Sequence, residues 1–237
     1  MYKKATFVLM SIGALLLVGN SASAKITKYE SYVTIKDATK EDYTIKYSAS
    51  TLNDNKKAEV HTDASLFRGD EYLTDVQGNV KVSDTYTYYP HGQRITYKVK
   101  TDHVESVGTK TSDFKQSQDK VTYDPKDWTY NKVSDEEAKQ EAQAFDNLLT
   151  QRANEIAADT GIDLSEYSLI EKTDVWEMDK DLFKEVRELT GNLSKGDKMP
   201  QIHLHESGES LYVLRQYADG TNTAVEFMLE NGKWEKK

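Results

Sequence analysis

The sequence contains no cysteine, so disulfide bonds, thiol catalysis, cysteine-ligated metal sites and lipid attachment to an N-terminal cysteine are all excluded. Only three prolines occur in 237 residues, and no proline-rich linker marks a boundary between domains. After residue 24 no apolar run approaches the roughly 20 residues that a membrane-spanning helix needs. We therefore expect no stable membrane insertion of the chain beyond that residue.

Residues 1–24 have the three parts of a secretory signal peptide. Lys3 and Lys4 precede an apolar stretch of about 14 residues, and small residues at Ala22 and Ala24 match the pattern that signal peptidase cleaves. We predict cleavage after Ala24, with retention as an uncleaved N-terminal anchor as the alternative. The mature protein is then secreted or held at the cell surface. Such a leader on a lysine-rich chain without cysteine is typical of Gram-positive bacteria.

Basic residues are in the minority, with 31 Lys and Arg against 40 Asp and Glu and a net charge of −9. The leader holds two of the lysines and no acid, so its removal leaves 29 basic and 40 acidic residues and a charge of −11. Nucleic-acid binding needs clustered basic side chains and is disfavoured. An acidic surface instead attracts a basic partner.

The stretch from Tyr29 to Tyr123 alternates apolar and polar residues, as half-buried antiparallel strands do. Turn residues such as those at 53–55, 68–70, 77–79 and 90–92 separate the alternating segments. We predict a β-rich lobe over residues 25–133, containing about six or seven strands of one broad antiparallel sheet.

Ser134 starts a helical pattern that ends at Gly161, and a second, shorter helix begins at Asp179 or Asp181 and ends at Gly191. Between them, residues 167–178 are ambiguous. A β-hairpin follows over residues 211–229, turning at Asp219 and Gly220. Residues 134–237 thus form a helix–helix–hairpin lobe, continuous with the first as one domain. The predicted fold class is α+β, with the broad sheet packed on the long helix.

Motifs for serine nucleophiles, phosphate loops and dinucleotides are absent, and no cofactor is predicted. His203 and His205 lie two apart in a predicted strand, followed by Glu206, and could share a metal ion given another ligand. The alternative is that both rings face solvent. An acidic run at 174–181 could bind calcium or act in catalysis, but capping of the second helix explains it better.

Tyrosine is unusually abundant, with 15 residues against six phenylalanines and three tryptophans. Tyrosine rings give a large, rigid contact area with a polar tip, as at many interfaces. Alternatively, they line a ligand groove or replace leucine and phenylalanine in a half-buried sheet. Tyr89 breaks the alternation and is predicted to be the most exposed. The candidate binding residues are Tyr43, Tyr47, Tyr86, Tyr88, Tyr89 and Tyr97.

These observations favour a secreted, non-enzymatic protein that binds another protein. The partner is expected to be basic, and the sequence does not identify it. An immunity or inhibitor protein acting against an exported toxin or hydrolase fits the charge and the leader. The alternative is an extracellular carrier or sensor of a small apolar ligand such as a lipid. A third hypothesis is a metal-dependent cell-wall hydrolase using the histidine pair.

Overall fold

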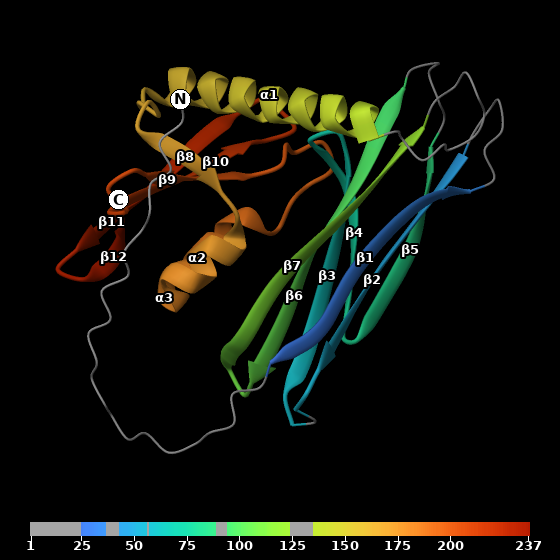
Figure 1. Cartoon of the computed structure of the whole chain (residues 1–237). Coiled ribbons are helices and arrows are strands. Elements are labelled where there is room, and N and C mark those ends of the chain that lie inside the picture. The colour runs from blue at the N-terminus through green and yellow to red at the C-terminus, as the bar shows by residue number, and fades with distance from the viewer. Residues whose placement is uncertain (1–24, 37–42, 56, 89–93, 124–134) are drawn as a thin grey trace.

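The computed structural model describes residues 25–36, 43–55, 57–88, 94–123 and 135–237 (Figure 1). More than half of these residues lie in strands, so the fold is mostly β and the predicted α+β class is wrong. The strands are β1 (Ile26–Lys36), β2 (Tyr43–Asn53), β3 (Glu59–Arg68), β4 (Glu71–Gly78), β5 (Lys81–Tyr88), β6 (Ile95–Val107), β7 (Lys110–Tyr123), β8 (Tyr167–Ile170), β9 (Gln201–His205), β10 (Ser210–Gln216), β11 (Asn222–Glu230) and β12 (Lys233–Lys236). The helices are α1 (Asp135–Thr160), α2 (Lys172–Met178) and α3 (Lys180–Thr190).

The first seven strands form two sheets that pack face to face, which we call the sandwich lobe (Figure 1). One sheet has the order β1-β2-β5 and the other β4-β3-β6-β7, and all neighbours are antiparallel. Alternate residues of both sheets point inward and make one apolar core, which includes Ile45, Leu66 and Val99. The prediction of a single broad sheet is therefore wrong. Alternation shows that one face of a strand is buried, but it does not show what covers that face.

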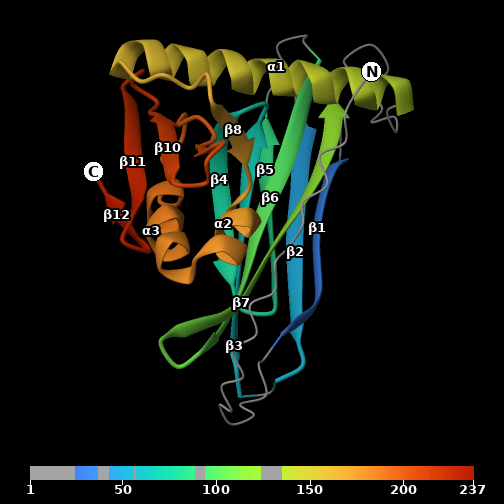
Figure 2. The same ribbon diagram turned by 60° about the vertical axis from the view of Figure 1, so that its left-hand side comes forward.

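The C-terminal lobe, residues 135–237, contains a five-stranded antiparallel sheet of order β12-β11-β10-β9-β8. Helix α1 lies along one face of this sheet, and α2 with α3 covers the other (Figures 1 and 2). Leu214 packs with Ala153 and Ile156 of α1, whereas Leu211 and Val213 belong to the core on the other side. Both faces of the sheet are thus covered by helices.

Helix α1 runs from Asp135 to Thr160 and ends at Gly161, whose φ of 74° suits glycine at a helix C-terminus. The predicted packing of this helix on the broad sheet is wrong, because its main strand contacts are with β10 and β11. Helix α3 begins after Asp179, whose Oδ1 accepts from the N–H groups of Asp181 and Leu182. The ambiguous region contains both β8 and α2. No helix in the described ranges is long and apolar enough to span a membrane.

The two lobes share apolar contacts. Phe114, on the β6–β7 hairpin of the sandwich lobe, lies with its ring centre 4.5 Å from that of Phe183 in α3. A second cluster joins Phe67 and Tyr72 of the sandwich lobe to Met199 of the C-terminal lobe. These contacts fix the position of one lobe against the other.

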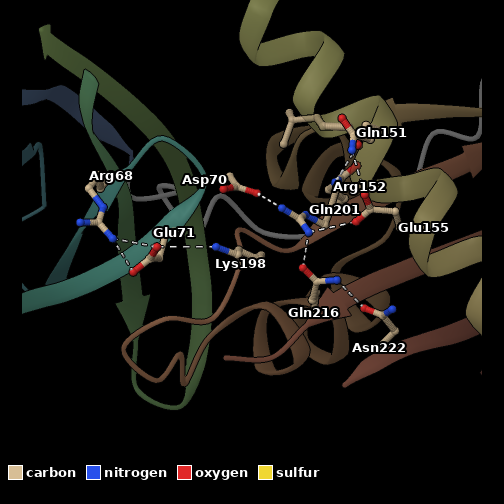
Figure 3. Close-up of polar contacts among 11 residues, drawn as sticks. Arg68, Asp70, Glu71, Gln151, Arg152, Glu155, Lys198, Gln201, Gln216 and Asn222 are labelled. Carbon is tan, nitrogen blue, oxygen red and sulfur yellow. Dashed lines mark hydrogen bonds and ion pairs between the residues drawn. The ribbon is translucent and has the colours of Figure 1, made fainter. Parts of the chain in front are cut away.

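A polar cluster, which we call the inter-lobe junction, joins the turn between β3 and β4 to the C-terminal lobe (Figure 3). Arg152 of α1 lies between Asp70 and Gln216, with its Nη2 3.3 Å from Asp70 Oδ2 and its Nη1 hydrogen-bonded to Gln216 Oε1. Beside it, Lys198 Nζ lies 3.6 Å from Glu71 Oε2. Backbone bonds, such as Met199 N–H to the Asp70 carbonyl at 2.7 Å, complete the junction.

Candidate functional site

A cavity of about 270 Å³ lies between the outward face of the β4-β3-β6-β7 sheet and the C-terminal lobe, and we call it the inter-lobe cleft. Its floor is formed by β3, β4, β6 and β7, and its other walls by residues around β8, β9, the start of α2 and the end of α3. The charged residues that line it are Asp63, Asp75, Lys100, Asp102, Glu171 and Lys172. The apolar lining includes Phe67, Tyr72, Leu149, Leu169, Leu193 and Met199.

The strand register places the polar floor residues in a row. Asp63 lies opposite Gln77 on β4 and opposite Asp102 on β6, and Asp102 lies opposite Gln116 on β7. Cross-strand neighbours on one face have Cβ atoms about 5 Å apart, so their side chains interact directly. Gln77 Nε2 donates to Asp63 Oδ2 at 3.3 Å and to Asp75 Oδ2 at 3.0 Å. Four strands thus bring two amides and three carboxylates to the same surface.

Two ion pairs cross the cleft from the floor to the C-terminal lobe. Lys172 Nζ lies 2.5 Å from Asp102 Oδ2, and Lys100 Nζ lies 3.1 Å from Glu171 Oε2. Burial raises the pKa of Asp102, but the charge of Lys172 and the hydrogen bonds from Lys172 and Gln116 outweigh it and hold the pKa below its ordinary value. Asp102 therefore remains ionised as the partner of Lys172.

Asp63 is the acid in the cleft with the most unusual titration. Burial raises its pKa to about 6, and the carboxylates of Asp102 and Asp75 add to the rise, whereas Lys172 and Arg187 oppose it. Among the described residues, neither Asp63 nor Asp75 has a basic nitrogen within 4 Å. A half-buried acid with a raised pKa in a cavity is a typical functional-site residue.

Two acceptor atoms in the floor row are buried without a hydrogen-bond donor from any residue that the structure describes. These atoms are Asp63 Oδ1 and Gln116 Oε1. The orientation of the Gln116 amide is fixed, because its Nε2 donates to Asp102 Oδ1 at 2.8 Å and only the NH₂ group can do so. Buried acceptors without donors are costly and rare, and because β6 separates Asp63 on β3 from Gln116 on β7, each atom would need its own donor.

Replacing Asp63 with asparagine is expected to stabilise the ligand-free protein at pH 7. The folded state holds the acid at a pKa of about 6 against an ordinary 3.8, so ionisation costs stability as pH rises through this window. The full shift corresponds to about 3 kcal/mol, and partial exposure reduces the expected gain to about 1–2 kcal/mol. Urea unfolding measures it.

The gain from Asp63→Asn should shrink as pH falls from 6 toward 4, because the wild-type carboxyl then becomes protonated in the folded state. Asp84→Asn, an exposed substitution on β5 outside the cleft, is the matched control and should change little at either pH. A loss of stability in Asp63→Asn at pH 7 would contradict the assignment of Asp63 as a strained acid.

The structure places the candidate tyrosines mainly inside the sandwich lobe. Tyr43, Tyr47 and Tyr97 are fully buried between the sheets, and the hydroxyl oxygens of Tyr43 and Tyr97 lie 2.5 Å apart. Tyr86 is partly buried and packs against the same core. Tyr89 and the side chain of Tyr88 lie outside the described part of the structure. Three of the six rings therefore serve the core and offer no surface to a partner.

The histidines of β9 do not gather with a third ligand. His203 is buried, its Nε2 lies 3.1 Å from Gln201 Oε1, and burial lowers its pKa to about 4. His205 is bound on both sides, with Nε2 3.0 Å from Glu166 and Nδ1 2.8 Å from Ser207. Glu206 is exposed. In the ranges that the structure describes, no group of three or more His, Asp or Glu side chains could hold a metal ion.

The acidic run is explained by helix capping. Asp179 caps α3, and Asp174 Oδ2 accepts from the Glu171 N–H at 2.8 Å at the start of α2. The cleft residues, in contrast, were not found from the sequence. Asp63 and Asp102 occupy ordinary outward positions of alternating strands, and only the fold brings them opposite each other.

Comparison with known proteins gives no family for this chain. No family model matches it, and no curated protein matches it in sequence. Among solved structures, a Bacteroides uniformis β-glucuronidase is 13% identical with a TM-score of 0.29, over 39% of this chain and 13% of that chain. A protein from Archaeoglobus fulgidus is 10% identical with a TM-score of 0.24, over 42% of this chain and 98% of that one. Similarities this low carry no argument about function.

Proposed function

We propose that this protein is an exported, non-enzymatic binding protein that holds a small molecule in the inter-lobe cleft. The observation that supports this most directly is the cavity itself, which combines apolar walls with a few converging polar groups. Ligand sites in proteins have this composition and often lie between lobes or domains. The volume of about 270 Å³ lies at the small end of the roughly 300–1,000 Å³ of ligand pockets, which suits a small ligand.

The cleft supports small-molecule binding better than the tyrosines support binding to another protein. The protein-binding hypothesis needs exposed rings, and Tyr43, Tyr47 and Tyr97 are buried. The small-ligand hypothesis needs a cavity between layers. The cleft differs from a lipid site in its floor of carboxylates and amides, so we propose a ligand that is partly polar.

A second candidate function is acid–base catalysis in the same cleft. The pKa of Asp63, about 6, lies near the pH at which a carboxylate can act as a general acid or base. Asp75 lies on the neighbouring strand and shares the donor Gln77 with Asp63. A binding protein would release its ligand unchanged, whereas a catalyst would release a chemically altered molecule.

Native mass spectrometry tests the proposal directly. The chain from residue 25, exposed to a small-molecule extract of the culture medium in which the producing organism grows, should acquire one adduct. Ser65→Phe, which fills the cleft from β3, should acquire none. Ser83→Phe adds the same bulk to an exposed position of β5 and should retain the adduct. Equal spectra for all three proteins would overturn the proposal, and a chemically altered ligand would favour catalysis.

A further inference from the structure

We propose that the ligand of the inter-lobe cleft is an organic cation, with an ammonium group bound between Asp63 and Asp75 and an apolar body against the C-terminal lobe. This inference rests on the proposed function and names the ligand class. It is argued from three features of the cleft: carboxylates without a basic partner, buried acceptor atoms without donors, and apolar walls.

The charge balance of the cleft leaves two carboxylates without a basic partner. Four acids and two lysines line it. Both lysines are engaged, Lys172 with Asp102 and Lys100 with Glu171. Among the described residues, Asp63 and Asp75 therefore line the cavity without a basic partner, and the hydrogen bonds that Asp75 accepts come from the neutral side chains of Tyr72 and Gln77. Lys172 and Arg187 lower the pKa of Asp63 only from a distance, and Arg187 does not line the cleft. A cation would supply the missing charge.

The hydrogen-bonding pattern also favours a ligand that donates. In the described part of the chain, Asp63 Oδ1 and Gln116 Oε1 are buried acceptors without donors, and they belong to the same row of the floor. An ammonium group has three donors and no acceptor. An ammonium group at Asp63 brings donors only, whereas a carboxylate or phosphate would add further acceptors to this floor. The cleft is thus complementary to a donor in both charge and hydrogen bonding.

The remaining walls indicate that the cation is organic. The described residues contain no cluster of three or more acids or histidines that could hold a metal ion. Phe67 and Met199 are buried apolar residues at the cleft, and Leu169 is 47% exposed there. Apolar lining favours a ligand with a hydrocarbon part. A chain of five carbons with a terminal ammonium group is a suitable minimal probe.

A zwitterion is the alternative that the test must separate from a simple cation. Its carboxylate would have to bind Lys100 or Lys172, and each of these lysines already holds an acid of the cleft. Breaking the largely buried Lys172–Asp102 pair would leave Asp102 without its partner, which is strongly unfavourable. The ion pairs therefore favour a ligand without a negative group.

Four five-carbon probes test the ligand class: pentylamine, 5-aminopentanoate, 1-pentanol and pentanoate. Their affinities for the chain from residue 25 are measured at pH 8 by NMR titration. We expect saturable binding of pentylamine, at least tenfold tighter than that of the other three. Asp63→Asn should weaken pentylamine at least tenfold, and Asp84→Asn should leave its affinity unchanged. Below pH 6 the affinity should fall by up to tenfold per pH unit, because protonation of Asp63 removes the charge.

Two classes of result would overturn the inference. Tighter binding of 5-aminopentanoate, or equal binding of 1-pentanol, would assign the ligand to another class. An unchanged affinity in Asp63→Asn would remove Asp63 from the site. If no probe binds while native mass spectrometry finds an adduct that Ser65→Phe loses, the ligand class is wrong and the proposed function stands. If that adduct is also missing, the proposed function fails.

Discussion

Arg152→Ala is expected to lower the free energy of unfolding by about 3–5 kcal/mol, the range measured when one member of a buried ion pair is removed. Arg152 is the centre of the inter-lobe junction, where it contacts Asp70 and Gln216 (Figure 3). Asp70 is only 6% exposed. Without the guanidinium, its carboxylate stays buried and loses its cationic partner. Chemical unfolding at pH 7 measures the loss.

The control is Glu155→Ala, which removes another partner of the same arginine. Glu155 lies one turn away on α1, its side chain is 43% exposed, and its Oε2 is 3.0 Å from Arg152 Nη1. Exposed pairs of this kind contribute less than about 1 kcal/mol, so this variant should remain close to the wild type. Comparing the two variants distinguishes the cost of leaving the buried Asp70 carboxylate without a cation from the cost of losing an exposed contact on α1.

A second substitution distinguishes the mechanism. If the cost of Arg152→Ala comes from a stranded charge, adding Asp70→Asn should recover part of the stability, because the neutral amide no longer needs a cation. A double variant that loses the sum of both single losses would contradict this account. The junction would then act through packing around the β3–β4 turn and not through its charge.

The sequence predicted local elements well where their ends carry specific residues. Gly161 and Gly191 end α1 and α3, and Asp179 begins α3, because capping depends on a single residue and its immediate neighbours. The hairpin of β10 and β11 turns at Gly220, with a φ of 88°. These features can be inferred without knowledge of the rest of the fold.

The arrangement of the strands could not be predicted in the same way. β2 pairs with β1 and β5, and β3 pairs with β4 and β6, so the chain changes sheets three times: between β2 and β3, between β4 and β5, and between β5 and β6. An alternating strand gives the same pattern whether its apolar face meets a helix or another sheet. This ambiguity explains why Tyr43 and Tyr97 were candidates for a binding face although they lie in the core of the sandwich lobe.

The cleft was missed for a related reason. Asp63 and Asp102 are outward residues of β3 and β6, and such residues usually face solvent. Their significance comes from the C-terminal lobe, which covers this part of the sheet and brings Lys172 to Asp102. Pairing across 70 positions of sequence leaves no local signal. Covariation between these positions is the kind of evidence that would have revealed it.

Acidification is expected to destabilise the protein through His103, which is completely buried in the sandwich lobe. Its Nδ1 lies 2.6 Å from the Thr51 hydroxyl and its Nε2 2.6 Å from that of Ser117. Burial lowers its pKa to about 4, against the smaller opposing influence of Asp102. The unfolded chain takes up a proton near pH 6.5 and the folded protein only near 4, so stability is lost as pH falls through this window.

The size of this effect is about 3 kcal/mol between pH 7 and pH 4, from a shift of about 2.5 pH units. Other groups titrate in the same range. His203 acts in the same direction, whereas Asp63 acts in the opposite one because its pKa is raised. The contribution of His103 must therefore be measured as a difference between two proteins at each pH.

His103→Gln provides that difference, because glutamine both donates and accepts hydrogen bonds but does not titrate. We expect the stability of the wild type relative to this variant to fall by about 3 kcal/mol from pH 7 to pH 4, as measured by urea unfolding at each pH. A constant difference across the range would show that His103 titrates alike in both states. That result would mean that water reaches the imidazole of His103. The hydrogen bonds of His103 to Thr51 and Ser117 would then not exclude solvent from this part of the sandwich lobe.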